Sequence, residues 1–161
     1  MPPAYRGKIT RLNSLYERVC MADIQLATTD TAIDACFPVM VQLRPQLTRA
    51  DFAARIRAQM QSGYHLAFLA QQGAVTTVAG FRFGQSLSWG RYLYVDDLVT
   101  DIAHRSRGFG GKMLAWLTVY ARDHGCEQLH LDSGLQRTDA HRFYQLEGLP
   151  AVAYHFAKGL D

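Results

Sequence analysis

Three apolar segments separated by short turn-like connections restrict the fold of this chain more than any other feature. They are YHLAFLAQ (64–71), AVTTVAGFRF (74–83) and RYLYVDDLVT (91–100). Each is rich in β-branched and aromatic residues, and both connections contain glycine, a residue that favours tight turns. The pattern predicts three adjacent antiparallel strands.

Two helices are expected before these strands. Asp30 is placed to cap the first helix, which Pro38 is expected to kink or to divide with a new first turn. Thr48 and Asp51 form a capping-box pattern ahead of a second apolar helix face, and Gly63 supplies a stop signal. The segment DIQLAT (23–28) before both helices is strand-like.

The second half of the chain alternates between helix and strand patterns. Apolar residues recur at helical spacing from 109 to 120, and CEQLHLDSG (126–134) follows as a strand. A short helix is expected in TDAHRFYQLEG (138–148), capped by Thr138 or Asp139, and AVAYHFAKGL (151–160) is the expected last strand. The order predicts an α/β, or α+β layered, domain with a mixed, mostly antiparallel sheet and helices on both faces.

Length and composition indicate one folded unit. The 161 residues include 48% hydrophobic and 19% charged residues, which is ordinary for a globular protein. We expect a single domain at 21–161, preceded by a poorly ordered extension at 1–20. With neither a long apolar stretch nor an apolar signal core, the sequence predicts a cytoplasmic protein.

Several partner classes are disfavoured by the residue pattern. The net charge is only +3 and basic residues are scattered outside 105–112, which argues against a nucleic-acid partner, just as the missing apolar span argues against a membrane partner. The histidines lack metal-ligand spacing, and the three cysteines contain no CxxC pair. We expect no bound metal and unreactive thiols.

The segment HRSRGFGGK (104–112) combines glycine with positive charge at the predicted junction between a strand and a helix. Backbone N–H groups in such a loop can approach an anion, and the helix N-terminus adds partial positive charge. A Walker loop is excluded because Lys112 is followed by Met113 instead of a hydroxyl residue. A dinucleotide fingerprint is excluded because Met113 stands where its third glycine belongs.

The remaining pattern, Arg105-x-x-Gly108-x-Gly110, resembles the Q/R-x-x-G-x-G/A motif of the GNAT superfamily of acyl-CoA-dependent N-acyltransferases. AHRFYQLEG (140–148) resembles the family's A-x-x-F/L-Y-x-x-x-G segment, and the resemblance spans residues 24–158. It implies acetyl-CoA as co-substrate, with the pantetheine arm along the backbone of Leu98, Val99 and Thr100. It also implies a pyrophosphate site made by Arg105, Ser106, Arg107, Gly108, Phe109, Gly110, Gly111 and Lys112.

The resemblance also suggests catalytic residues. The family tyrosine that faces the CoA sulfur corresponds to Tyr144, a candidate acid for the leaving thiolate, whereas the neighbouring Phe143 is assigned to the core. Polyamine N-acetyltransferases carry an acidic pair at the distance of Asp96 and Asp97, and aminoalkylphosphonate N-acetyltransferases carry one glutamate at the position of Asp97. Asp97 is the first candidate base and Asp96 the second, although strand alternation sends them to opposite faces unless a bulge intervenes.

Two positions near the tyrosine are less certain. Arg137 stands where many family members have a cofactor-contacting asparagine, so that role is not transferred to it. His141 is either a substrate contact or a surface residue.

The sequence thus predicts an N-acetyltransferase that uses direct attack by a primary amine, expected to be a small molecule, in a ternary complex. A small anionic amine recognised by Arg44, Arg55 or Arg82, a protein amine, and a non-catalytic acyl-CoA-binding module are the alternatives. Exposed strand edges in the C-terminal half would allow a homodimer.

Overall fold

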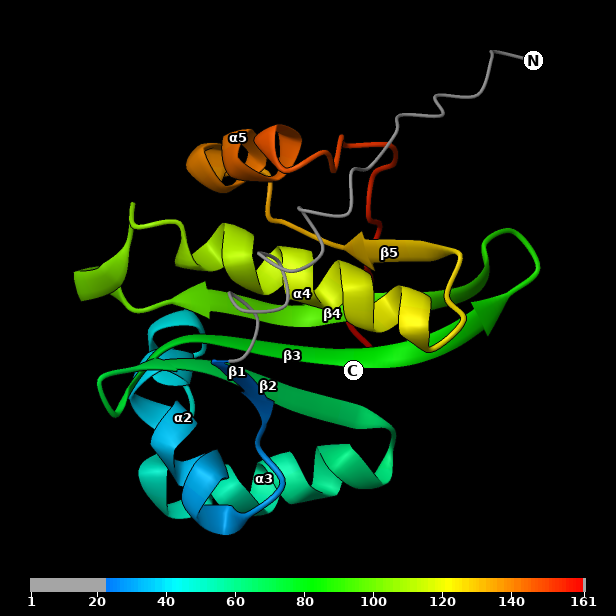
Figure 1. Cartoon of the computed structure of the whole chain (residues 1–161). Coiled ribbons are helices and arrows are strands. Elements are labelled where there is room, and N and C mark those ends of the chain that lie inside the picture. Colours follow the sequence, from blue (N-terminus) through cyan, green and yellow to red (C-terminus); the bar gives the residue numbers. More distant parts are fainter. Residues whose placement is uncertain (1–22, 161) are drawn as a thin grey trace.

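The computed structural model describes residues 23–160 (Figure 1). In chain order its elements are β1 (Ile24–Leu26), α2 (Asp30–Leu43), α3 (Arg49–Gln61), β2 (Tyr64–Gln71), β3 (Ala74–Ser86), β4 (Gly90–Thr100), the 3-10 helix η1 (Ile102–His104), α4 (Phe109–Asp123), β5 (Gln128–Leu131) and α5 (Thr138–Leu146). The five strands form one sheet in sequence order, and all neighbours are antiparallel except β4 and β5. The predicted run of three antiparallel strands is confirmed.

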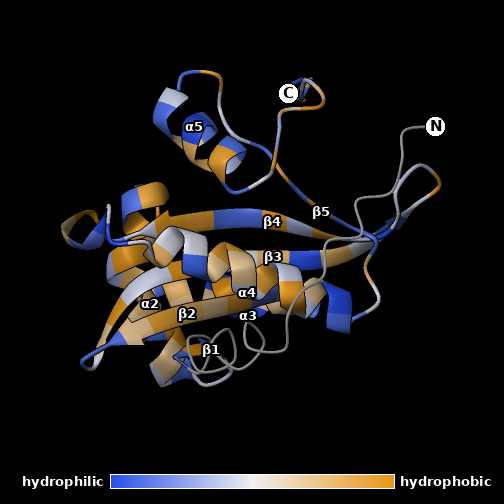
Figure 2. Ribbon diagram, turned by 45° about the horizontal axis from the view of Figure 1, so that its top comes forward, coloured by the Kyte–Doolittle hydropathy of each residue, from blue (hydrophilic) through white to orange (hydrophobic). Residues whose placement is uncertain are grey.

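Helices cover both faces of this sheet, as expected. In Figure 1, α2 and α3 lie on one side of the sheet and α4 on the other, with α5 beside the start of α4. The apolar face of α4, which includes Met113, Leu114 and Leu117, packs against Phe81 and Leu93 of the sheet. A second buried cluster joins α2 and α3 to the opposite face. In Figure 2, β2 and β3 carry mostly hydrophobic colours, as expected for strands covered on both faces.

One of the predicted N-terminal caps is present, and two differ from the prediction. The Thr48–Asp51 capping box is present, but α2 is capped by Thr29 instead of Asp30, because Thr29 Oγ1 accepts a hydrogen bond from the Ala32 N–H at 3.2 Å. The helix continues through Pro38, so no new helix begins there. The residue before α5 is Arg137, so neither Thr138 nor Asp139 is its N-cap.

The predicted last strand is wrong. Residues 151–160 have no regular secondary structure and are exposed, including the side chains of Val152, Tyr154 and Phe156. In Figure 2 the C-terminal end lies away from the sheet. Apolar alternation indicates that a segment can form a strand, but a strand needs a hydrogen-bonded neighbour, and the sheet within residues 23–160 ends at β5.

Membrane-spanning helices and metal-binding clusters were also searched for among the described residues. None of the helices within residues 23–160 combines the length and the apolar character needed to cross a bilayer. The described residues also hold no group of three or more histidine, cysteine, aspartate or glutamate side chains arranged to bind a metal ion. The predicted extension at 1–20 lies outside the described residues.

Candidate active site

A β-bulge brings the two adjacent aspartates to one cavity. On β3 and β4, Gly80 is paired with Asp97 but Phe81 is paired with Val95, so Asp96 is the extra residue of the bulge. Both carboxylates therefore line the same cavity of about 650 Å³. Strict alternation would have sent them to opposite faces of the sheet, and the bulge cancels this alternation locally.

Both oxygens of the Asp97 carboxylate have a donor. Arg44, the residue that follows α2, donates from Nε to Oδ1 at 2.7 Å, and its Nη2 donates to the carbonyl oxygen of Asp96 at 3.0 Å. The Tyr64 hydroxyl donates to Oδ2 at 2.8 Å. The Asp97 side chain is only 13% exposed, whereas that of Arg44 is 45% exposed.

Tyr64 reaches Asp97 across an intervening strand because residue 80 is glycine. Tyr64 begins β2, Gly80 lies on β3 and Asp97 lies on β4. A Cβ at position 80 would stand 1.7 Å from the Tyr64 hydroxyl oxygen, so any side chain there would collide with the phenol. Burial and the neighbouring Asp97 carboxylate raise the pKa of Tyr64, which keeps the hydroxyl protonated and able to donate.

Asp96 has a separate arginine partner. Arg82 donates from Nε to Asp96 Oδ2 at 2.8 Å and from Nη2 to Gln59 Oε1 at 3.0 Å. Four arginines and three aspartates line the cavity: Arg44, Arg55, Arg82, Arg137, Asp96, Asp97 and Asp132. Carboxylates and guanidinium groups thus face the same space, with one positive charge in excess.

Tyr144 of α5 also lines this cavity. Burial raises the pKa of its phenol, and Arg137 partly opposes the effect. The proton is therefore retained at neutral pH, as an acid requires. Phe143 packs against the core cluster that contains α4, as expected, and His141 Nε2 lies 2.9 Å from the carbonyl oxygen of Gly134.

The end of β4 offers a backbone edge beside the cavity. β5 pairs with β4 only from Tyr92 to Val95, so β5 does not cover the edge of residues 96–100, including Leu98, Val99 and Thr100. Such an edge can hydrogen-bond an extended amide-containing chain. A Cβ at Gly110 would lie 3.3 Å from the Phe143 ring and 3.6 Å from Thr100 Oγ1, so the end of β4, the start of α4 and α5 meet here.

The glycine loop joins this edge to α4. Ser106 and Gly108 have positive φ angles of 62° and 79°, and Gly108 is the residue before the helix. The first amides of α4 have no acceptor inside the helix and carry the positive end of its dipole. A Cβ at Gly108 would meet no atom within 4 Å, so the space beside this residue is open. Chemically, such a loop can bind an anion and the β4 edge can pair with an extended amide chain.

Not every predicted loop side chain is directed to an anion. Lys112 Nζ is 3.2 Å from Asp23 Oδ2, and Arg105 Nε donates to the Thr100 carbonyl oxygen at 3.3 Å. Arg107 and Ser106 are exposed. The support for an anion here therefore comes mainly from the backbone amides.

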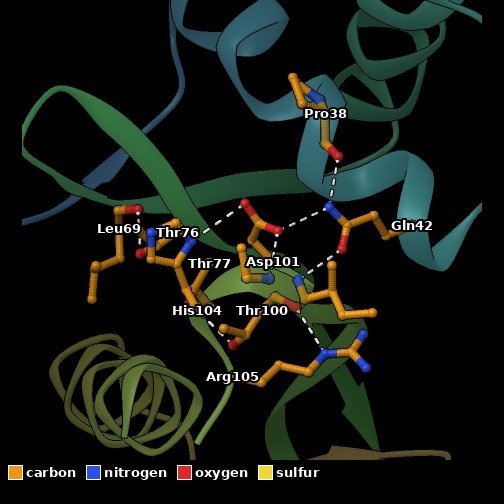
Figure 3. A network of polar contacts seen from close by, with 11 residues as sticks. Pro38, Gln42, Leu69, Thr76, Thr77, Thr100, Asp101, His104 and Arg105 are labelled. Atoms are coloured by element: carbon orange, nitrogen blue, oxygen red, sulfur yellow. Dashed lines mark hydrogen bonds and ion pairs between the residues drawn. The ribbon is translucent and has the colours of Figure 1, made fainter. Parts of the chain in front are cut away.

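A polar network fixes where the loop starts (Figure 3). Gln42 of α2 donates from Nε2 to Asp101 Oδ1 at 3.2 Å and accepts from the Ile102 N–H at 3.0 Å. Asp101 also accepts from the Ala103 N–H at 3.1 Å, and its own N–H donates to the Thr76 carbonyl oxygen at 2.8 Å. Helix α2 is thereby tied to the segment that leads into the loop.

Sequence reasoning missed the residues that hold the candidate site together. Tyr64 and Gly80 were treated only as parts of strands, and Gln42 and Asp101 received no role. Arg44 was proposed as an anion contact, but here it pairs with Asp97. Glycine within a strand often marks the close approach of another group, and this signal was available at Gly80.

Comparisons with known proteins agree with the fold. Residues 28–148 match the model of the acetyltransferase (GNAT) family. The chain is 35% identical over 124 residues to the uncharacterized N-acetyltransferase YhdJ of Bacillus subtilis, covering 76% of this chain and 87% of that protein. It is 26% identical over 146 residues to the aminoalkylphosphonate N-acetyltransferase of Salmonella typhimurium, covering 87% and 92%.

A solved structure of an aminoglycoside N-acetyltransferase in complex with CoA has the same fold. It superposes with a TM-score of 0.74 at 14% identity and covers 86% of this chain and 93% of that one. The chain belongs to the acetyltransferase (GNAT) family and is an acyl-CoA-dependent N-acetyltransferase.

Proposed function

We propose that this protein transfers the acetyl group of acetyl-CoA to the primary amine of a small molecule, by direct attack in a ternary complex. The main support for this proposal is the edge of β4 beyond Val95. This edge lies between the cavity with two carboxylates and the loop that ends at Gly108, so one extended cofactor could reach both. Acetyl-CoA supplies an acetyl group already activated as a thioester. The backbone of residues 98–100 and of the loop would hold it.

Asp97 and Tyr144 carry the proton transfers in this proposal. An ammonium group must lose a proton before its nitrogen can attack, and Asp97, directly or through a water, accepts that proton. The new carbon–nitrogen bond replaces the carbon–sulfur bond, and Tyr144 gives its phenolic proton to the departing sulfur. The second proton lost by the nitrogen, as the amide forms, restores the Tyr144 phenol. Asp96, paired with Arg82, is the second candidate for the base.

Direct attack agrees with the state of the described cysteines. Burial raises the pKa of Cys36 to about 12 and also raises that of Cys126. Neither residue lines the cavity. Both therefore lack the thiolate character that an acyl-enzyme intermediate would need.

The charges in the cavity favour an amine that also carries an anionic group. A polyamine would meet four guanidinium groups as well as three carboxylates, whereas a zwitterionic acceptor can offer its amine to a carboxylate and its anion to an arginine. The relative from Salmonella typhimurium that is named for aminoalkylphosphonates supports this acceptor class. Arg55, whose Nη1 lies 3.7 Å from the exposed Asp51, and Arg137 are the candidate anion contacts besides Arg44 and Arg82.

Acetyl-CoA binding is the first test, measured by thermal shift for wild type, Gly108→Glu and Gly125→Glu. Both glycines have positive φ and open surroundings, but Gly125 lies at the other end of α4. A ligand at 100 times its Kd should raise the wild-type melting temperature by roughly 5–10 °C. The shift should persist in Gly125→Glu and be lost in Gly108→Glu, because the added carboxylate would repel the diphosphate.

Thiol release then identifies the acceptor among 2-aminoethylphosphonate, spermidine, propylamine and a lysine-containing peptide. Turnover of 2-aminoethylphosphonate above the others supports the zwitterionic class. Preference for the peptide would contradict the small-molecule assignment. Binding of acetyl-CoA without turnover of any amine would favour a non-catalytic acyl-CoA-binding module.

A further inference from the structure

Resting on the proposed function, we propose that Asp97 works by exchange of partners. Tyr64 holds Oδ2 of the carboxylate permanently, and Arg44 holds Oδ1 only until the ammonium group of the acceptor takes its place. Tyr64 is then a positioning residue, and Arg44 a residue that determines acceptor specificity.

The two partners of Asp97 differ in how firmly they are held. Tyr64 is only 5% exposed and belongs to the buried cluster that includes residues of α2 and α3. Its side chain crosses Gly80, which has no side chain to block it, and so reaches the carboxylate. Its hydrogen bond to Oδ2 can be lost only by moving a packed ring. The phenol therefore fixes the direction in which Asp97 presents its other oxygen.

Arg44 is anchored much less. It follows the last residue of α2, and its side chain is 45% exposed. An ion pair between exposed side chains changes an equilibrium constant by roughly fivefold at most. In this pair only the arginine side is accessible, because the Asp97 side chain is 13% exposed, so the guanidinium group can turn into water while the carboxylate stays in place. A cation that enters the cavity can therefore replace the guanidinium group at Oδ1 at little cost.

Replacement leaves Arg44 without Asp97 but still beside the bound acceptor. An acceptor with an anionic group regains this arginine as a partner, whereas a simple amine does not. The same exchange would thus present the ammonium group to Asp97 and select for a zwitterion. Both arginines make a second hydrogen bond, Arg44 to the Asp96 carbonyl oxygen and Arg82 to Gln59 Oε1. Arg82 is less suited to such an exchange, because its side chain is only 33% exposed, against 45% for Arg44.

The test compares wild type, Tyr64→Phe, Arg44→Gln and the control Tyr120→Phe in steady-state kinetics. Tyr120 is a partly buried tyrosine of α4 that packs against Phe81, away from the cavity. The acceptors are 2-aminoethylphosphonate and propylamine, which differ in the anionic group. Circular dichroism and acetyl-CoA affinity report on folding and on the cofactor site.

Tyr64→Phe should lower kcat at least about tenfold for both acceptors and leave the KM for acetyl-CoA unchanged, because a misdirected carboxylate affects the reacting geometry. Arg44→Gln should act in opposite directions on the two acceptors. The KM for propylamine should fall up to roughly fivefold, because a competing cation is gone. The KM for 2-aminoethylphosphonate should rise roughly tenfold or more, because its anion loses a partner.

An equal rise of KM for both acceptors in Arg44→Gln, or a wild-type kcat in Tyr64→Phe, would overturn the exchange. The arginine variant decides the question alone if Tyr64→Phe fails to fold. Absence of turnover by wild type would instead contradict the proposed function. In that case the positioning role of Tyr64 is tested by crystal structures of wild type and Tyr64→Phe. An Asp97 side-chain conformation that is the same in both would overturn this role.

Discussion

Tyr144 is a partly buried tyrosine that lines the polar cavity. The pKa of its phenol is raised by burial, so the proton is present throughout the neutral range. A donor of this kind is useful where a thiolate leaves, provided that it lies within hydrogen-bond reach of the sulfur.

Tyr144→Phe should therefore lower kcat by roughly 10²–10⁴-fold and leave acetyl-CoA affinity unchanged, because only the proton donor is removed. Steady-state kinetics and calorimetric binding measure the two effects. Tyr154→Phe is the control, because Tyr154 is 74% exposed and lies in the C-terminal segment. Wild-type kcat in Tyr144→Phe would assign the residue to packing alone.

The second prediction concerns the substitution of Gly80 by alanine. Alanine there would place Cβ 1.7 Å from the Tyr64 hydroxyl oxygen, and alanine at Gly84 on the same strand would place it 2.3 Å from the Tyr92 ring. Both substitutions should lower the free energy of unfolding by about 1–3 kcal/mol, because each overpacks a tyrosine.

The two variants should differ in activity, measured per folded molecule after the folded fraction is determined by urea unfolding. Gly80→Ala should lower kcat, because it moves Tyr64 away from Asp97, whereas Gly84→Ala should not. Equal kcat values would show that the Tyr64 contact does not matter for turnover.

At the scale of elements, the junction between α2 and η1 sets the position of the glycine loop. Asp101 caps η1 and accepts a hydrogen bond from Gln42 of α2. The pKa of Asp101 is lowered, first by the hydrogen bond from the Ala103 N–H and then by that from Gln42. A carboxyl group with a lowered folded-state pKa stabilises the fold above its unfolded-state pKa, and this contribution is lost as pH falls through the folded-state value.

Asp101→Asn should therefore be less stable than wild type at pH 7, by about 0.5–1 kcal/mol for a weakened cap. The difference should shrink as the pH falls below ~4, because the carboxyl is then protonated in the unfolded chain, and it should vanish once the pH is below the lowered folded-state pKa. Urea unfolding at pH 7 and at pH 3 measures both values. A difference that does not vary with pH would show that the charge of Asp101 does not stabilise this junction.

Elements with strong local signals were predicted well, and those that depend on a distant partner were not. The three central strands and the Thr48–Asp51 capping box follow from neighbouring residues and were correct. The strand at 151–160 was wrong, because alternation does not supply a pairing edge. The bulge at Asp96 was raised only as an exception, since register is set between strands.

At the scale of the whole molecule, residues 151–160 expose apolar side chains that no other part of the described chain covers. Val152, Tyr154 and Phe156 alternate along residues that lie outside the sheet, and His155 Nδ1 is 2.9 Å from Asp132 Oδ2 just beyond β5. Apolar side chains this exposed favour association. We therefore propose a homodimer that buries the exposed apolar side chains of this segment.

Light scattering coupled to size-exclusion chromatography should give twice the mass of one chain for wild type. The mass of one chain is expected for Phe156→Asp, because a buried charge would oppose pairing. Leu87→Asp, which alters an exposed leucine of the β3–β4 turn, is the matched control and should remain dimeric. A wild-type monomer at every concentration would contradict the proposal.

The sequence by itself determined the order of the strands and α-helices as far as α5, the glycine loop and the family, because these depend on periodicity and on residues close together in the chain. Only the tertiary structure decided how the two aspartates are held. Arg44 and Tyr64 are 53 and 33 positions from Asp97 in sequence, and no local pattern indicates that they meet. Their contacts depend on strand register, on the bulge and on the missing side chain at Gly80, all of which arise when the sheet assembles.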